Sequence, residues 1–139
     1  MTLRYLLDTN MISEPVRPLP NANVMTQLIE AKSTVAIASI VWQEVLLGCY
    51  RMPDSKRRRA IEAYLQEEVK VKLPILPYTQ EAAEWFAKER ARLIPIGLTP
   101  SYADGQIAAI AKVNNLILVT RNVADYANFQ DLAIENWFS

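Results

Sequence analysis

Short apolar runs alternate along the chain with longer segments in which apolar residues recur with helical periodicity. The short runs, such as Val35–Ala38, are continuous rather than alternating, which is typical of strands that helices cover on both faces. We expect five strands: Leu3–Leu7, Val35–Ala38, Leu73–Leu76, Leu116–Val119 and Leu132–Glu135. The alternation of strands and helices predicts an α/β fold around a parallel sheet.

Five helices are expected between these strands, and each follows a residue type that favours a helix start. They span Ala22–Ala31, Ile40–Tyr50, Ser55–Val69, Gln80–Leu93 and Ser101–Val113. The expected N-caps are Asn21, Ser39, Asp54, Thr79 and Thr99, the last with Pro100 at the first helical position. The proline-rich breaks at residues 15–20 and 95–100 are too short for interdomain linkers, so we expect one domain over residues 1–139.

The composition describes a globular chain without a global attraction for nucleic acid. Of its 139 residues 51% are hydrophobic, and 15 Lys and Arg residues balance 15 Asp and Glu residues. A nucleic-acid partner would therefore have to be held by local patches. The single cysteine, Cys49, forbids an internal disulfide and is expected in the core. No signal peptide or membrane-spanning run is recognisable, so we expect a cytoplasmic protein.

The chain contains no histidine. This absence excludes Ser-His-Asp and Cys-His nucleophiles, and it excludes metal sites that rely on imidazole ligands. Chemistry in this protein must therefore use carboxylates, hydroxyls, amides and cations. A bound metal would be a hard ion with oxygen ligands, Mg²⁺ or Mn²⁺ before any other.

Four acidic residues are expected at the carboxyl edge of the sheet. Asp8 follows the first strand and Asp125 follows the fourth, and ligands of open parallel sheets bind beyond this edge. Glu44 and Asp104 fall on apolar stripes of their helices, where no basic residue stands at helical spacing to neutralise them. A shared cation would balance all four charges.

Taken singly, these acids also have structural interpretations. Asp8 could close an Asx-turn, Asp125 could serve a turn after Asn122, and Asp104 could favour the N-terminus of its helix. Four acids at one edge favour a site instead. The glutamates expected on solvated helix faces are Glu30, Glu62, Glu67, Glu68, Glu81, Glu84 and Glu89.

Four ordered segments surround these acids: Leu7-Asp8-Thr9-Asn10, Trp42-Gln43-Glu44-Val45, Pro100 to Ala108 with Asp104, and Thr120-Arg121-Asn122 followed by Asp125-Tyr126. In this order and spacing they resemble the PIN-domain nucleases, and specifically the VapC-type ribonuclease toxins of bacterial toxin-antitoxin pairs. The continuation through Ile12-Ser13-Glu14 resembles the FitB-like branch. The resemblance covers nearly the whole chain.

The resemblance implies a three-layer α/β/α sandwich with a mostly parallel sheet and a metal-dependent endoribonuclease. The acidic quartet that would hold Mg²⁺ or Mn²⁺ is Asp8, Glu44, Asp104 and Asp125. Thr9 and Thr120 would be hydroxyl helpers, and Asn122 would be an amide helper. A metal-activated water would hydrolyse the RNA phosphodiester and leave 5′-phosphate and 3′-hydroxyl ends. The implied partners are RNA, a cognate antitoxin protein and a second copy of the chain, without a membrane.

Two groups of basic residues could contact RNA phosphates. The run Lys56–Arg59 is more typical of a solvated helix start, whereas Arg121 lies within the edge segment itself. We therefore expect Arg121 to contribute more to RNA affinity than the run.

Two other functions remain open at the level of sequence. An Asp at a strand end with Mg²⁺ is also typical of phosphoryl-transfer proteins, but Asn10 stands where a dehalogenase-like phosphatase needs a second Asp. The paired acids and late-strand lysine of a receiver domain are absent as well. A catalytically silent PIN-like module that binds RNA or protein would be favoured by a missing acid, and all four are present.

Overall fold

The computed structural model describes residues 2–139. Its centre is a five-stranded sheet in the order β3-β2-β1-β4-β5, in which every neighbouring pair is parallel. The strands are β1 (Tyr5–Leu7), β2 (Val35–Ala38), β3 (Ile75–Leu76), β4 (Ile117–Val119) and β5 (Ile134–Glu135). All five expected strands are confirmed, and all but β2 are shorter than the apolar runs that predict them.

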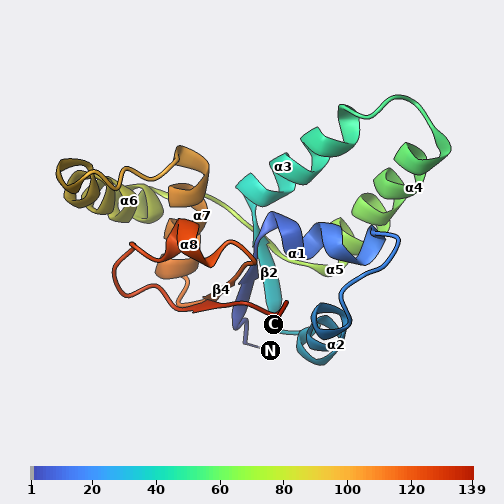
Figure 1. Ribbon diagram of the computed structural model, residues 1–139, viewed down its shortest axis with the longest axis horizontal. Helices are drawn as coiled ribbons and strands as arrows, with labels where there is room; N and C mark the ends of the chain where they lie inside the picture. The colour runs from blue at the N-terminus through green and yellow to red at the C-terminus, as the bar shows by residue number, and fades with distance from the viewer. Residues whose placement is uncertain (1) are drawn as a thin grey trace.

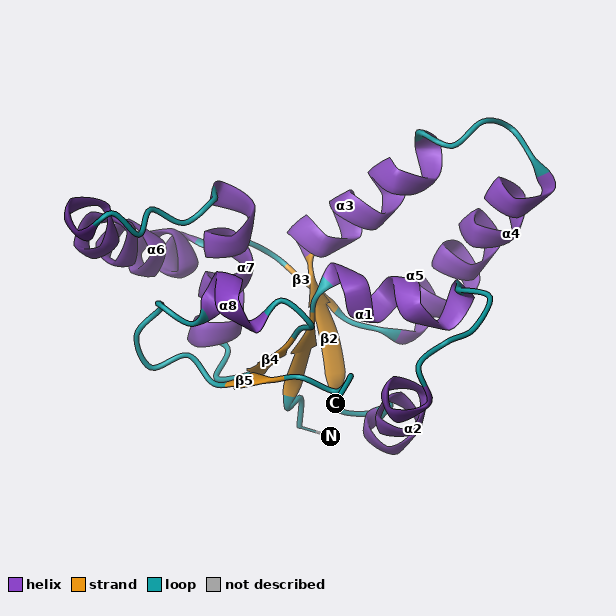
Figure 2. Cartoon of the chain, viewed as in Figure 1, coloured by secondary structure: helices purple, strands orange, loops and turns teal. Residues whose placement is uncertain are grey.

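Helices cover both faces of the sheet and give three layers (Figure 1, Figure 2). They are α1 (Thr9–Ser13), α2 (Ala22–Ala31), α3 (Ser39–Tyr50), α4 (Lys56–Tyr64), α5 (Lys70–Lys72), α6 (Gln80–Leu93), α7 (Tyr102–Val113) and α8 (Val123–Tyr126). In Figure 1, α6, α7 and α8 lie on one side of the sheet and α1, α2, α4 and α5 on the other, while α3 extends past the carboxyl end of β2. The expected α/β/α sandwich is confirmed. Within residues 2–139, no helix has the length and apolar character needed to cross a membrane.

Asn21 and Thr79 cap α2 and α6 as predicted, but three of the predicted caps are wrong. The observed caps are Ala38, Ser55 and Ser101, where Ser39, Asp54 and Thr99 are expected. For α4 and α7, the cap is the serine whose side-chain oxygen accepts a hydrogen bond from an N–H of the first turn, that of Arg58 or Asp104. Ala38 has no such oxygen, and α3 begins without a side-chain cap. The short helices α1 and α8 are not predicted, because four or five residues are too few to show a helical period.

The core lies between the sheet and both helical layers. Leu6, Ile37 and Leu118 on the three central strands are fully buried, as continuous apolar runs require when helices cover both faces. Cys49 on α3 is also buried, which confirms its expected core position.

The close packing of α6 against α7 depends on a glycine beside one predicted site residue. Gly105 is buried, and a Cβ at this position would lie 2.0 Å from the Phe86 ring, so no larger residue fits without moving α6. The Arg90 guanidinium lies 4.1 Å from the centre of the Tyr102 ring and donates to the carbonyl oxygen of Pro100. The first turn of α7 is thereby held against α6.

The prediction that Glu89 lies on a solvated helix face is wrong. Its buried carboxylate accepts hydrogen bonds from the Arg92 guanidinium at 2.9 and 3.1 Å and from the Gln130 N–H at 2.7 Å. Arg92 also donates to the carbonyl oxygen of Asn128. The Glu89–Arg92 ion pair therefore ties the segment after α8 to α6. Helical periodicity does not show this role, because Asn128 and Gln130 lie about 40 residues further along the chain.

Candidate active site

The parallel register of β1 and β4 places Asp8 beside Thr120. Leu7 pairs with Val119, so the next residue of each strand stands at the carboxyl edge of the sheet. The Thr120 hydroxyl donates a 2.8 Å hydrogen bond to Asp8 Oδ2, and the Thr9 N–H donates a 2.8 Å hydrogen bond to Asp8 Oδ1. Asp8 therefore caps α1 while its carboxylate is buried at this edge.

Glu44 reaches the same edge from α3, which follows β2 directly. The Thr9 hydroxyl donates a 3.1 Å hydrogen bond to Glu44 Oε2. The side chain is half-buried, and burial is the main cause that raises the pKa of Glu44. The Thr9 hydrogen bond lowers this pKa, whereas the charges of Asp8 and Asp104 raise it further. The ionised carboxylate therefore lacks a balancing charge.

Asp104 lies in the first turn of α7, where its N–H donates to Ser101 Oγ. Burial is again the main cause that raises the pKa of Asp104, and the charges of Asp125 and Asp8 add to it. Hydrogen bonds with Ser101 and Tyr126 act in the opposite direction. The ionised forms of Glu44 and Asp104 thus both cost free energy that a cation would relieve.

One phenol joins Asp104 to Asp8. Tyr126 Oη lies 3.2 Å from Asp104 Oδ1 and 3.4 Å from Asp8 Oδ2, and its single proton can serve one carboxylate at a time. The side chain is 1% exposed, and burial together with the neighbouring carboxylates raises the pKa of Tyr126. Sequence reasoning does not find this residue, because only the packing of α8 shows where its hydroxyl points.

Asp125 and Asn122 stand at the outer margin of this arrangement, and both are exposed. The Asn122 N–H donates a 3.0 Å hydrogen bond to Thr120 Oγ, which orients that hydroxyl toward Asp8. Asp125 and Asp104 line the same cavity of about 240 Å³. The structure therefore connects six of the seven predicted site residues by hydrogen bonds or a shared phenol, namely Asp8, Thr9, Glu44, Asp104, Thr120 and Asn122, and places Asp125 beside Asp104 in the same cavity.

The donor atoms of this site are of the type that a hard divalent cation prefers. All of them are oxygens, and none of the ion pairs found in residues 2–139 involves Asp8, Glu44 or Asp104. In this part of the chain, no three acidic or cysteine side chains lie close enough together to enclose a cation as they stand. The hydroxyls of Thr9 and Tyr126 lie between the carboxylates, so these side chains would have to rotate for the carboxylates to hold an ion.

We predict that Tyr126→Phe weakens Mg²⁺ binding about tenfold, a typical cost of losing a hydrogen-bond partner of a metal ligand. The phenol sets the spacing of Asp8 and Asp104, so without it the two carboxylates repel each other freely. Calorimetric titration with Mg²⁺ measures this change. The matched control is Tyr64→Phe, which removes a phenol that donates a 2.8 Å hydrogen bond to the Ile12 carbonyl oxygen. Equal Mg²⁺ affinities for wild type and Tyr126→Phe would contradict the prediction.

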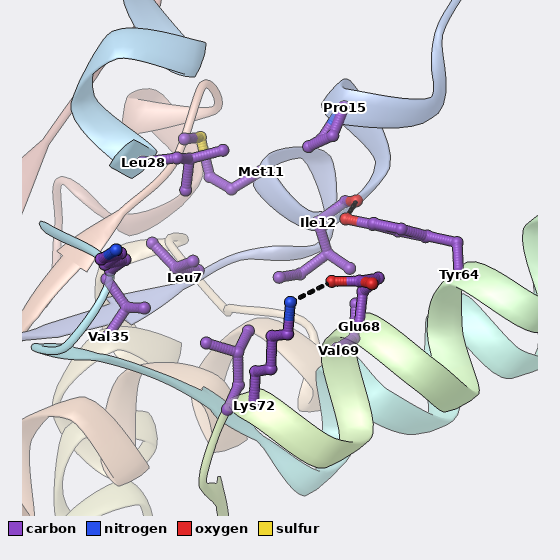
Figure 3. A pocket seen from close by; sticks show the side chains of 12 residues that line it. Leu7, Met11, Ile12, Pro15, Leu28, Val35, Tyr64, Glu68, Val69 and Lys72 are labelled. Carbon is purple, nitrogen blue, oxygen red and sulfur yellow. Dashed lines mark hydrogen bonds and ion pairs between the residues drawn. The ribbon is translucent and has the colours of Figure 1, made fainter. Parts of the chain in front are cut away.

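A larger apolar cavity lies away from this edge (Figure 3). It measures about 340 Å³ and is lined mainly by apolar side chains, among them Leu7, Ile12 and Val69. The Lys72 ammonium and the Glu68 carboxylate form an ion pair beside it. None of the four predicted metal ligands lines this cavity, so it is separate from the acidic site.

The chain is similar to solved structures and to curated proteins over most of its length. A structure described as FitAB bound to an IR36 DNA fragment matches with a TM-score of 0.88 and 29% identity, over 97% of this chain and 96% of that chain. Toxin FitB of Neisseria gonorrhoeae is 33% identical over 127 residues, which cover 87% of this chain and 89% of that protein. Ribonuclease VapC2 of Rickettsia felis is 28% identical over 135 residues, which cover 96% and 97%.

The fold and its acidic carboxyl edge define a class of α/β/α proteins that bind their ligands beyond the carboxyl ends of parallel strands. The PIN domain family matches residues 5–131, and the chain belongs to this family. The resemblance that the four ordered segments indicate is therefore confirmed.

Proposed function

We propose that this protein is an endoribonuclease toxin that hydrolyses RNA phosphodiester bonds with Mg²⁺ or Mn²⁺. The observation that carries the proposal is the hydrogen-bonded group of Asp8, Glu44 and Asp104 at the carboxyl edge of the sheet. Its relatives are named as a toxin and as a ribonuclease, which supports the same activity for this chain.

In this mechanism the chain holds and orients the groups around the scissile phosphate. Asp8, Glu44 and Asp104 would hold the ion, with Asp125 completing the set from the outer margin. A divalent cation there would activate water and neutralise charge on the phosphate. Thr120 and Thr9 each donate to a carboxylate and so fix the direction of its lone pairs. The exposed amide of Asn122 would contact the substrate.

The proposed partners are RNA, a cognate antitoxin protein and a second copy of the chain. The FitAB structure to which this chain is similar is a complex bound to DNA, and this similarity supports an antitoxin partner here. An antitoxin would restrain the nuclease by covering the acidic edge.

The function is tested by cleavage of RNA by the purified chain. We expect EDTA to abolish cleavage and Mg²⁺ or Mn²⁺ to restore it, while Zn²⁺ substitutes poorly because no imidazole ligand and no thiolate is available at the site. Full activity in EDTA would contradict the metal mechanism. No activity with any cation, combined with RNA or antitoxin binding, would show a silent binding module instead.

A further inference from the structure

A second cavity opens directly beside the acidic site. It measures about 300 Å³ and lies between α1, α3 and α4, the helices grouped together in Figure 1. Thr9 and Glu44 belong to its lining, so it is continuous with the site where the scissile phosphate would bind. Its other walls are mainly apolar and include Ile12, Val45 and Leu65. The size is at the lower end for small-ligand pockets, which suits one nucleotide.

A glycine leaves space on the helix that walls this cavity. Gly48 lies inside α3, where glycine is a poor helix former compared with alanine. A Cβ at Gly48 would have no neighbour within 4 Å, so no packing within the chain requires a glycine there. The bare backbone therefore allows a molecule from outside to approach α3 closely.

The basic run at the start of α4 supplies one free cation to the cavity. The Arg58 guanidinium donates to the Met52 carbonyl oxygen and lies over the Tyr50 ring, and Arg59 pairs with Asp54. Arg57 lines the cavity and belongs to none of the ion pairs found in residues 2–139. Arg58 and Arg59 therefore have partners within the chain, whereas Arg57 is available to a ligand.

Arg121 lies outside the lining of this cavity and makes contacts with other parts of the fold. Its guanidinium lies 4.8 Å from the centre of the Phe138 ring, and its charge acts on the buried Glu14. Its N–H donates to the Asn10 side chain, which joins the two loops of the edge. Arg121, like Arg57, belongs to none of the ion pairs found in residues 2–139, but only Arg57 lines this cavity and could bind a phosphate there. The expected contribution of Arg121 to RNA affinity stays a separate prediction.

We infer that this cavity is the subsite for the nucleotide next to the cleaved bond. The inference rests on the proposed ribonuclease function and adds the position of the substrate. The nucleobase lies against the apolar wall beside Gly48, and the Arg57 guanidinium binds its phosphate. A single-stranded segment fits, because its unstacked base can turn away from the backbone into the cavity.

Two variants test the subsite through the KM for cleavage of a short single-stranded RNA. Gly48→Leu fills the cavity, and Arg57→Ala removes the free cation; each is expected to raise KM about tenfold while kcat stays within about twofold. The slope of log KM against log salt concentration should fall by about 0.7 for Arg57→Ala, as expected for one lost phosphate contact on a single strand.

The matched controls change the same helices without blocking the subsite. Gln43→Ala changes an exposed residue of α3 that lies outside the lining of this cavity, and it should keep the wild-type KM. Arg59→Ala removes a neighbouring arginine that is paired with Asp54 and should also keep the wild-type KM.

If wild type cleaves RNA and both Gly48→Leu and Arg57→Ala keep its KM, the subsite is wrong although the proposed function stands. The subsite is equally wrong if these variants lose a protein partner but not RNA. If wild type does not cleave, the proposed function fails, and binding of the same RNA decides the subsite. Weaker binding by both variants then supports it, and unchanged binding overturns it.

Discussion

Replacing Asp8 with asparagine is expected to reduce RNA cleavage by more than about 100-fold, because losing a metal ligand costs more than losing a ligand's hydrogen-bond partner. The metal-free fold should be as stable as wild type or more stable. Asparagine can still cap α1 through Oδ1, and its amide can face the Thr120 hydroxyl, which can accept a hydrogen bond. The change also removes one of the charges that raise the pKa values of Glu44 and Asp104.

Thermal melts with EDTA and with Mg²⁺ separate these effects. The Mg²⁺-induced rise in Tm should shrink in Asp8→Asn, because stabilisation by a ligand falls as its Kd rises. Glu67→Gln changes an exposed acid on the segment after α4. It should alter neither the Tm in EDTA nor the Mg²⁺-induced rise in Tm. If Asp8→Asn melts well below wild type in EDTA and keeps the full Mg²⁺ shift, Asp8 is a structural cap and the site lies elsewhere.

Replacing Glu89 with alanine is expected to destabilise the protein by about 3 kcal/mol, near the lower end for breaking a buried ion pair because Arg92 is partly exposed. Three hydrogen bonds to the carboxylate are lost, and the segment after α8 is released from α6. Tm should fall by about 10 °C at neutral pH. Glu84→Ala on the exposed side of the same helix should change Tm little.

The pH dependence of this loss identifies its cause. Hydrogen bonds from Arg92 lower the pKa of Glu89, burial opposes them, and the Gln130 N–H lowers it further. The folded state therefore favours the ionised form, so the stabilisation is present above the ordinary glutamate pKa and disappears as pH falls through the lowered value. The Tm difference between wild type and Glu89→Ala should shrink on acidification. A constant difference would assign the loss to packing alone.

Tyr126 and Glu89 act on the same part of the fold by different means. Tyr126 is the last residue of α8 and contacts the carboxylates, whereas Glu89 binds the backbone of the segment that follows α8. We expect the position of the phenol to depend on this ion pair, because Gln130 lies only four residues after Tyr126. A weaker Mg²⁺ response in Glu89→Ala would follow from this arrangement.

The sequence by itself determined the strands, the five longer helices and the edge at which the acids stand. Apolar runs and helical periods are local, so Val35–Ala38 and Gln80–Leu93 can be recognised without knowing their neighbours. The carboxyl ends of parallel strands share one edge, so the order of strands and helices along the chain is enough to assign Asp8 and Asp125 to it.

Only the tertiary structure decided which polar groups touch one another. The register of β1 with β4 brings Thr120 to Asp8, and the packing of α8 brings the Tyr126 hydroxyl between two carboxylates. These contacts join residues that are far apart in the chain, so no local pattern encodes them. The burial of Glu89 and the position of Arg57 beside a cavity were likewise decided by tertiary structure. Folding determines which groups surround a charged side chain, and the neighbouring sequence does not show them.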